Sequence, residues 1–142
     1  MSGLLVDTNV LSEFSRRGGP EQRVKNWLKA APPASLYTSV LTIAEIRRGI
    51  ELLPPGKRRA ELELWLETEL LPSFDTNLLP VTRAVADRWA VLSARAQERG
   101  TPLAVIDGLI AATALEHELV LVTRNVRDFA DLGVSIFNPW EA

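Results

Sequence analysis

Five short apolar segments alternate with longer segments of helical pattern, and this alternation constrains the fold of the chain more than any other feature. Gly3–Val6 and Leu119–Thr123 are nearly continuous apolar runs, typical of strands buried on both faces. Pro80 lies within a third run and cannot donate a hydrogen bond inside a sheet, so that strand is expected at an edge. The remaining expected strands are Ser35–Ser39, Leu78–Val81 and Ser135–Phe137. Strands separated by helices predict an α/β fold with a short, mainly parallel sheet covered by helices.

Helical periodicity fills the intervals between these strands. Asp7 or Thr8 can cap the first helix, which we expect to run to about Arg16. Proline and glycine interrupt the pattern between helices, and no repeat, low-complexity tract or linker divides the chain. The other expected helices are Glu21–Lys29, Thr42–Leu52, Arg58–Leu71, Thr82–Glu98 and a segment that starts at about Val105. With 142 residues the sequence predicts one domain that spans residues 1–142.

Composition excludes several classes of protein. The chain has no cysteine, which excludes disulfides, thiolate metal sites and a cysteine nucleophile. It has no apolar run long enough to span a membrane and no signal-peptide pattern at its start, so we expect a cytoplasmic protein with no membrane partner. The net charge of −2 argues against a generally basic nucleic-acid binder but allows local basic patches.

Asp107 is the residue that ordinary folding explains least well. It is the only charge between Leu103 and Leu115, a stretch whose apolar character predicts core. An aspartate is rarely buried without a partner, and no basic residue lies within this stretch. Asp107 therefore either caps a helix at the edge of the core, or it meets other parts of the fold around a cation.

Three further acids are expected at the same edge of the sheet. Asp7 ends the first strand, Glu45 follows the second, and Asp128 follows the last strong one. The carboxyl ends of parallel strands share one edge, where ligands bind in such sheets. Two carboxylates about 4 Å apart repel by roughly 4 kcal/mol at an effective dielectric near 20, so a cluster needs protons or a cation. An oxygen-only site favours Mg²⁺ or Mn²⁺, which indicates phosphodiester or phosphoryl chemistry.

Each of these acids also has a purely structural interpretation. Asp7 can serve only as a helix cap, and Glu45 can form a capping box with Thr42. Asp128 can be a loop residue next to Phe129. Spacing by itself does not separate these interpretations from the catalytic one.

Four short motifs carry a more specific signal. In chain order they are Val6-Asp7-Thr8-Asn9, Ala44-Glu45-Ile46-Arg47-Arg48-Gly49, Ile106-Asp107-Gly108-Leu109-Ile110-Ala111-Ala112-Thr113-Ala114 and Thr123-Arg124-Asn125. Together they resemble the PIN-domain ribonucleases, in particular the VapC-type toxins of bacterial toxin–antitoxin pairs. The ending Phe137-Asn138-Pro139-Trp140 is similar to the FitB-like branch. The resemblance covers essentially the whole chain and implies a three-layer α/β/α PIN domain.

The resemblance also implies roles for individual residues. Asp7, Glu45 and Asp107 match the three central acids of the family and would hold one or two Mg²⁺ or Mn²⁺ ions that activate a water. Thr8, Asn9 and Thr123 would support them. Many relatives carry Asp where this chain has Asn125, so Asp128 is the candidate fourth acid. The candidate RNA contacts are Arg47, Arg48 and Arg124, with Arg16 and Arg17 as further basic positions.

The implied function is that of a metal-dependent endoribonuclease, the toxin of a type II toxin–antitoxin pair. The resemblance further implies a homodimer and a VapB- or FitA-like antitoxin whose C-terminal segment covers the acidic site; Trp27 and Trp65 lie on helices that can supply such surfaces or simply pack in the core.

Two alternatives stay open. An aspartyl-phosphate phosphatase is partly matched by Leu4-Leu5-Val6-Asp7-Thr8-Asn9-Val10, although Asn9 replaces its usual second Asp and no late lysine is present. A non-catalytic PIN-like binding module is the other. A Ser–His–Asp hydrolase is disfavoured because His117 is the only histidine and no nucleophile elbow is present, and a Walker-type nucleotide binder is excluded by the absence of its motif.

Overall fold

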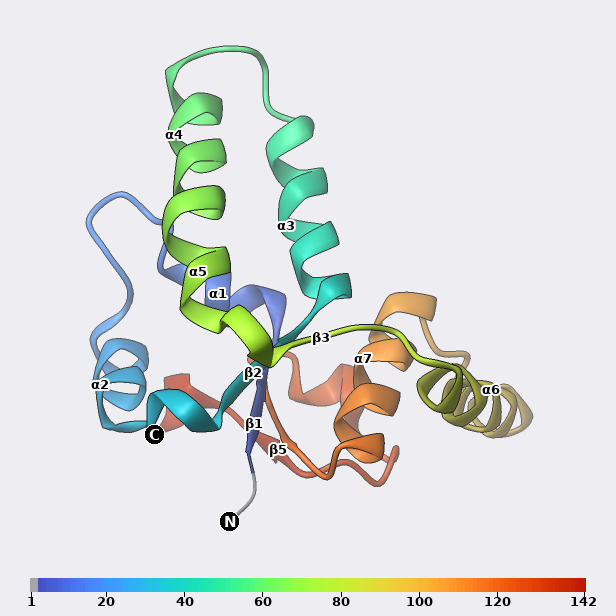
Figure 1. Ribbon diagram of the computed structural model, residues 1–142. Helices are drawn as coiled ribbons and strands as arrows, with labels where there is room; N and C mark the ends of the chain where they lie inside the picture. Colours follow the sequence, from blue (N-terminus) through green and yellow to red (C-terminus); the bar gives the residue numbers. More distant parts are fainter. Residues whose placement is uncertain (1–2) are drawn as a thin grey trace.

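The computed structural model describes residues 3–142, which form a five-stranded sheet enclosed by helices (Figure 1). Every strand pair is parallel, and the strand order is β3-β2-β1-β4-β5. The strands are β1 (Leu4–Val6), β2 (Leu36–Ser39), β3 (Leu78–Leu79), β4 (Val120–Val122) and β5 (Ile136–Phe137). All five expected strands are present, and β3 is at the edge, as predicted, although it ends before Pro80. Within residues 3–142 no helix is long and apolar enough to cross a membrane.

The helices largely occupy the intervals that the sequence predicts. They are α1 (Thr8–Glu13), α2 (Gln22–Ala30), α3 (Val40–Glu51), α4 (Lys57–Trp65), α5 (Leu71–Phe74), α6 (Arg83–Glu98) and α7 (Val105–Glu116). Short 3₁₀ turns at Pro33–Ser35, Asp75–Asn77, Val126–Phe129 and Pro139–Glu141 fill several of the connections. A π-helical segment, Leu66–Leu70, joins α4 to α5, so the expected Arg58–Leu71 helix is longer and locally underwound. The α3–α4 pair projects from the sheet (Figure 1).

Two predicted helix boundaries are wrong. The first helix ends at Glu13 rather than Arg16, because the chain turns at Phe14, whose backbone N–H bonds back to Leu11 and Ser12. The third begins at Val40 rather than Thr42, because the Ser39 hydroxyl accepts the Leu41 N–H as its N-cap.

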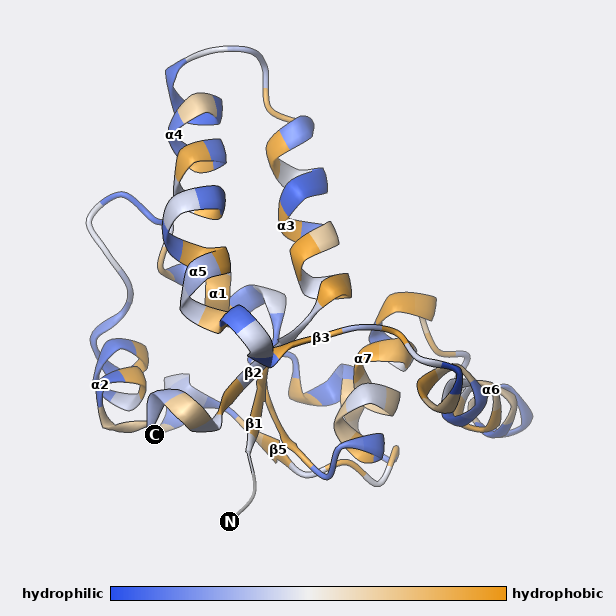
Figure 2. Cartoon of the chain, in the orientation of Figure 1, coloured by the Kyte–Doolittle hydropathy of each residue, from blue (hydrophilic) through white to orange (hydrophobic). Residues whose placement is uncertain are grey.

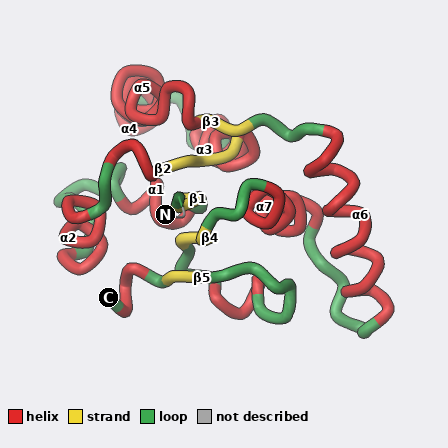
Figure 3. The backbone as a smooth tube through the Cα atoms, turned by 60° about the horizontal axis from the view of Figure 1, so that its bottom comes forward, coloured by secondary structure: helices red, strands yellow, loops and turns green. Residues whose placement is uncertain are grey.

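Two separate cores lie on opposite faces of the sheet, which confirms the layered α/β architecture. Side chains alternate along each strand. Leu5 and Leu121 therefore pack with α7, while Val6 and Val122 pack with α1, α2, α3 and the π-helical segment. Figure 3 shows α2 on one side of the row of strands and α6 and α7 on the other. Figure 2 shows the strands in hydrophobic colours, as expected for strands covered on both faces.

The topology creates one position where a ligand site is expected. After β1 the chain continues through β2 and β3 on one side of β1, and then returns to place β4 and β5 on the other side. The carboxyl ends of β1 and β4 therefore flank the point at which the strand order reverses. Binding sites of open parallel sheets lie at such switch points.

Candidate active site

Asp7 lies at this switch point, directly after β1. Leu4 pairs with Val120 and Val6 with Val122, so Asp7 and Thr123 are the next residues in register. The Asp7 backbone N–H donates to the Val122 carbonyl at 3.0 Å. The side chain is only 4% exposed. Strand pairing therefore fixes the position of the Asp7 backbone at the end of β1.

Both carboxylate oxygens of Asp7 accept hydrogen bonds. Oδ1 accepts the Thr8 backbone N–H at 2.8 Å, which makes Asp7 the N-cap of α1. Oδ2 accepts the Thr123 hydroxyl at 2.8 Å and the Asn9 side-chain amide at 3.4 Å. Burial raises the pKa of Asp7, the Thr8 and Thr123 hydrogen bonds lower it, and the charges of Glu45 and Asp128 raise it again. The capping interpretation is thus correct, and it does not compete with a role in the acid cluster.

Thr123 connects the other polar residues that the sequence analysis named as supports. Its fully buried hydroxyl accepts the Asn9 side-chain amide and the Asn125 backbone N–H, each at 3.1 Å, while it donates to Asp7. The Asn9 side-chain oxygen in turn accepts the Arg124 backbone N–H at 3.0 Å. This network ties the end of β1 to the end of β4 and leaves the Asp7 side chain little freedom to move.

Glu45 reaches the same site from α3. Its Oε1 accepts the Thr8 hydroxyl at 2.6 Å. Glu45 lies in the second turn of α3, so the predicted capping box with Thr42 is not formed; the cap is Ser39. The Thr42 hydroxyl is instead buried, with no hydrogen-bond partner within residues 3–142. Thr8 therefore connects the two acids: its hydroxyl donates to Glu45, and its backbone N–H donates to Asp7.

Asp107 has a different environment from Asp7. It is partly buried in the first turn of α7, whose N-cap is Ala104, so of the two interpretations of Asp107 the helix cap is wrong. Over residues 3–142 its carboxylate forms no ion pair and accepts no side-chain or backbone hydrogen bond that meets ordinary geometry. Burial raises the pKa of Asp107 to about 6, assisted by the charges of Asp7, Asp128 and Glu45.

The start of α7 is less buried than its apolar sequence predicts. Ala104 and Val105 are exposed, and Ile106 is 37% exposed, whereas residues from Gly108 to Ala114 form the buried part of the helix. The first turn of α7 thus lies at the edge of the fold rather than inside it. Asp107 sits where the exposed turn meets the buried one, which gives its carboxylate access to solvent.

Gly108 allows a close contact that the sequence analysis missed. A Cβ at this position would lie 2.8 Å from Trp89 Cδ1 and 2.9 Å from Leu103 Cδ2. Trp89, on α6, therefore packs directly on the α7 backbone next to Asp107. A glycine inside an apolar helix is a sequence signal for such close packing, although it does not name the partner.

The candidate fourth acid lies near Asp107 but in an exposed turn. Asp128 is exposed in the 3₁₀ turn after β4, and its charge acts on both Asp7 and Asp107. Asn125 contributes its backbone N–H to Thr123. Of the two candidates, Asp128 is therefore the one that brings negative charge to the site.

The donor set fits a hard divalent cation. All its charged groups are carboxylates, and Asp107 has oxygens without partners. No three acidic or histidine side chains in the described chain are close enough to serve together as ligands of one ion. The charges of the other acids instead act on Asp7 and Asp107 by electrostatic repulsion, without direct contact. This spacing suits Mg²⁺, which keeps several waters and binds one or two carboxylates directly.

The basic candidates differ in how free their guanidinium groups are. Arg47 forms an ion pair with Glu67 at 2.7 Å, and Arg16 pairs with Glu13 at 2.6 Å. Arg124 stacks over the Trp140 ring at 4.9 Å, a cation–π contact that the sequence did not reveal. Arg48 is exposed and has no carboxylate partner within residues 3–142. Of the basic residues considered from the sequence, Arg48 and Arg124 thus keep their N–H groups most available.

Comparison with known proteins decides the family. The family model described as PIN domain matches residues 4–134. This chain is a PIN-domain protein. The match includes the switch point and all four acids, and the fold of the PIN domain agrees with the layered α/β architecture expected from the sequence.

Relatives at full length confirm the resemblance to the FitB and VapC toxins. The PIN domain is 40% identical to Toxin FitB of Neisseria gonorrhoeae over 96% of this chain and 98% of that protein. It is 38% identical to VapC ribonuclease Y4jK of Sinorhizobium fredii over 97% and 98%, respectively. The crystal structure of FitAcB from N. gonorrhoeae covers 98% of this chain and 99% of the solved chain, with a TM-score of 0.90 and 40% identity.

A toxin–antitoxin complex from Klebsiella pneumoniae also has a similar structure. Its TM-score is 0.67 at 29% identity, over 96% of this chain and 98% of the solved one.

Proposed function

We propose that this PIN domain is a Mg²⁺- or Mn²⁺-dependent endoribonuclease and the toxin of a type II toxin–antitoxin pair. The observation that carries the proposal is the unpartnered Asp107 carboxylate, in electrostatic range of Asp7 and Glu45 at the switch point of the sheet. Membership of the PIN family and similarity to a protein named VapC ribonuclease support the reaction class. The RNA substrate would place this activity in the cytoplasm.

Asp7, Glu45 and Asp107 would form the metal site, with one or two of them binding the ion directly and the rest acting through its bound waters. Asp7 is fixed by Thr8 and Thr123, so its geometry is set before a ligand arrives. Glu45 is oriented by the Thr8 hydroxyl. Asp107 has free oxygens and gains most from a cation, because like charges surround it. A bound divalent ion would polarise the scissile phosphate and lower the pKa of an attacking water.

Asp128 and the supporting residues complete the proposed machinery. Asp128 would add negative charge at the outer side of the site, where it can accept a proton or hold a metal-bound water. Asn9, Thr123 and Asn125 would hold the ends of β1 and β4 in register. Arg48 and Arg124 are the proposed contacts with RNA phosphates, while Arg47 would first have to leave Glu67.

The direct test is metal-dependent cleavage by purified protein freed of any partner. Labelled RNA should be cut in Mg²⁺ or Mn²⁺, and EDTA should stop the reaction. Asp7→Asn and Glu45→Gln should abolish cleavage, whereas Glu98→Gln, an exposed residue on α6, should not. Cleavage that persists in EDTA, or that survives both site substitutions, would contradict the proposal.

The phosphatase alternative is disfavoured by the residue two positions after Asp7. Asn9, at the position of the usual second acid, is itself held by Asp7 and Thr123. Beryllofluoride binding or a stable phosphoryl label at Asp7 would revive this alternative. A non-catalytic module would show no cleavage in any metal while still binding its partner.

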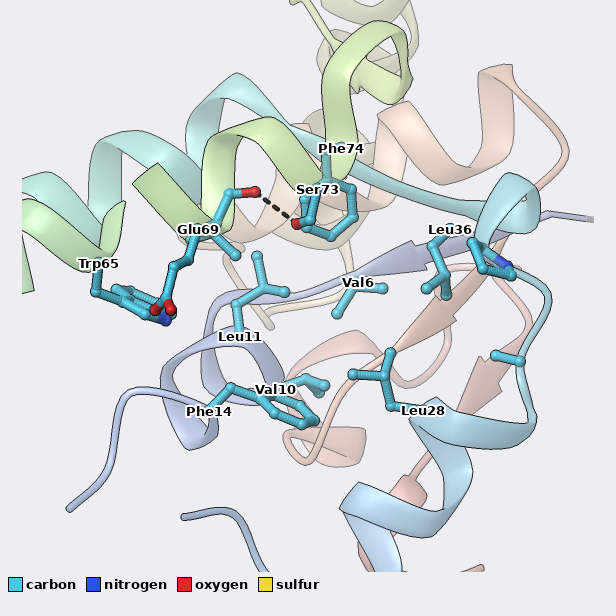
Figure 4. A pocket seen from close by; sticks show the side chains of 13 residues that line it. Val6, Val10, Leu11, Phe14, Leu28, Leu36, Trp65, Glu69, Ser73 and Phe74 are labelled. Carbon is cyan, nitrogen blue, oxygen red and sulfur yellow. Dashed lines mark hydrogen bonds between the residues drawn. The ribbon is translucent and has the colours of Figure 1, made fainter. Parts of the chain in front are cut away.

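An antitoxin segment is the proposed occupant of an apolar pocket beside α1 (Figure 4). The pocket encloses about 330 Å³ and opens between α1, α2 and the α4–α5 region. Leu11, Leu28 and Trp65 lie on its wall, and the Ser73 hydroxyl is turned to the Leu70 carbonyl at 2.6 Å.

Val6, one residue before Asp7, also lines the pocket. An amphipathic helix bound in this pocket would lie close to the acidic site, so that its continuation can cover the acids. The similar Klebsiella structure is a toxin–antitoxin complex, which supports a partner of this kind.

Partner binding has a test separate from catalysis. Leu28→Glu would place a charge in the pocket wall and should weaken binding of the cognate antitoxin at least tenfold without affecting RNA cleavage. Unchanged antitoxin binding would place the partner elsewhere.

The homodimer is a further part of the proposal. Val105 and Ile106 are exposed on α7 and can contribute to such a contact. Sedimentation of Val105→Glu against the unmodified protein tests this part: dissociation is expected, and an unchanged mass would exclude α7 from the interface.

A further inference from the structure

A second hollow opens beside the acids, on the side away from the apolar pocket of Figure 4. It encloses about 360 Å³, within the range of small-ligand sites. Its wall is built from three separate segments: the end of α6 with the loop that follows, the start of α7, and the turn after β4. Asp107 is part of that wall, so the hollow is continuous with the proposed catalytic site.

Two arginines in this wall differ from most arginines of the protein. Nine arginines pair with a carboxylate within 4.0 Å: Arg16, Arg17, Arg23, Arg47, Arg58, Arg59, Arg83, Arg88 and Arg95. Arg99 and Arg127 have no such partner within residues 3–142, although Asp107, Asp128 and Asp131 line the same hollow. Exposed cations that stay apart from nearby carboxylates are available to a negatively charged ligand.

One part of the wall is apolar. Pro102, Leu103, Ala104 and Leu132 contribute carbon surface, and Leu132 is 7% exposed. The hollow thus combines two guanidinium groups with an apolar surface and opens toward the acids. A nucleotide has the matching chemistry, because a charged phosphate is joined to a ribose and base with apolar faces.

We propose that this hollow is a nucleotide subsite, in which Arg99 and Arg127 bind an RNA phosphate next to the scissile one while the apolar wall takes the adjoining nucleoside. The proposal rests on the ribonuclease function proposed above and identifies one part of its substrate site. Arg99 and Arg127 would act in binding and alignment of the RNA, not in the bond-breaking step.

The charge balance agrees with this assignment. The three aspartates of the wall exceed its two arginines by one charge when all are ionised, so the hollow repels phosphate weakly in the absence of a cation. A divalent ion at the neighbouring acids would reverse the balance. RNA binding at this subsite should therefore be stronger with metal than without it.

The experiment compares two double variants by binding and by kinetics. R99A/R127A removes the unpartnered arginines, and R23A/R95A removes two exposed, ion-paired arginines outside the hollow as the matched control. Binding of a fluorescent single-stranded RNA is followed by anisotropy in EDTA at several salt concentrations, and cleavage is followed in Mn²⁺. R99A/R127A should raise KM about tenfold, leave kcat within about threefold, and lower the salt slope of binding by about 0.7, the value for one phosphate contact on a single strand. R23A/R95A should match the unmodified protein.

A third variant tests the apolar part without a change of charge. Ala104→Phe fills the mouth of the hollow from the exposed N-cap of α7 and should also raise KM. Circular dichroism should show that each variant is folded.

Several outcomes would overturn the subsite. One is R99A/R127A with the same KM as R23A/R95A, and another is a loss of kcat alone. A loss of antitoxin binding with unchanged RNA kinetics would assign the hollow to a protein partner instead. If the unmodified protein neither binds nor cuts RNA, the proposed function itself fails; if it cuts normally and only the arginine comparison fails, the subsite alone is wrong.

Discussion

Asp7 and Asp107 lie at the same edge of the sheet, yet their carboxylates differ in burial and in hydrogen bonding. Asp7 is 4% exposed and accepts hydrogen bonds on both oxygens, from Thr8 and from Thr123. Asp107 is more exposed and has no hydrogen-bond or ion-pair partner among residues 3–142. The more deeply buried acid is therefore the better satisfied one, and the unsatisfied acid keeps access to solvent.

This difference shows how a fold can keep an acidic cluster without unfolding. A buried carboxylate without partners would cost several kcal/mol, so the deepest acid receives donors from the backbone and from Thr123. Asp107 carries most of the remaining repulsion between the carboxylates, and solvent water screens part of that repulsion. Asp7 thus fixes the geometry of the site, and Asp107 supplies an unfilled oxygen for a ligand.

The largest expected effect comes from removing the unsatisfied charge. Asp107→Asn should lower metal-dependent RNA cleavage more than 100-fold, because it takes away the ligand with free oxygens, and the protein should stay folded. Single-turnover cleavage in Mn²⁺ measures the effect. Asp87→Asn, an exposed residue paired with Arg83 on α6, is the control and should cleave normally. Normal cleavage by Asp107→Asn would show that the unpartnered carboxylate of Asp107 is not needed for the reaction.

The second prediction concerns Asp7, the carboxylate whose two oxygens both accept hydrogen bonds. Thr123→Val keeps the side-chain shape but removes the donor to Asp7 and the acceptor for Asn9 and Asn125. We expect a loss of about 2 kcal/mol in the free energy of unfolding, measured by urea denaturation, together with reduced cleavage. Thr113→Val is the matched control: Thr113 is equally buried, but its hydroxyl bonds only to the Leu109 carbonyl of its own helix. A cost at Thr123 no greater than at Thr113 would show that the network adds nothing to stability.

The third prediction concerns the support of Asp107. Gly108→Ala should destabilise the protein by about 1.5 kcal/mol and reduce cleavage, because the new Cβ would push Trp89 and Leu103 away from α7. Gly49→Ala is the control, since Gly49 lies in α3 with nothing within 4 Å of the added Cβ, and it should stabilise the helix by roughly 0.5 kcal/mol. Thermal unfolding of the two variants gives the comparison. Equal stability of both would mean that the close contact at Gly108 is not needed.

The smallest predicted effect is a pH dependence of stability. Folding raises the pKa of Asp107 from 3.8 to about 6, so the folded state binds more protons between these values. The free energy of unfolding should therefore fall as pH rises from about 4 to about 6, relative to Asp107→Asn. The difference between the two proteins should reach on the order of 1 kcal/mol above pH 6, after allowance for solvent screening, and vanish below pH 4. Urea denaturation without metal at pH 4 and pH 7 checks it, and an equal difference at both values contradicts it.

Much of the secondary structure could be predicted, because the relevant patterns are local. Apolar runs identified all five strands, and periodicity with Gly and Pro breakers placed the helices. The errors occurred where a local signal had two interpretations. Thr42 and Glu45 match a capping box, but Ser39 caps α3. The stretch from Leu103 resembles core, but its helix starts at the edge of the fold, so Val105 is 58% exposed.

By itself, the sequence determined which chemistry is available: carboxylates and no thiols, placed directly after strands and in the motifs of a PIN domain. It did not determine which acid would accept hydrogen bonds and which would have a carboxylate without a partner. Thr123 reaches Asp7 across 116 positions only because β4 pairs with β1 in one register. Arg99 and Arg127 share one hollow because α6 packs on α7 and the chain then returns past it after β4. Such contacts depend on strand order and helix packing, which no local pattern encodes, so only the tertiary structure decided them.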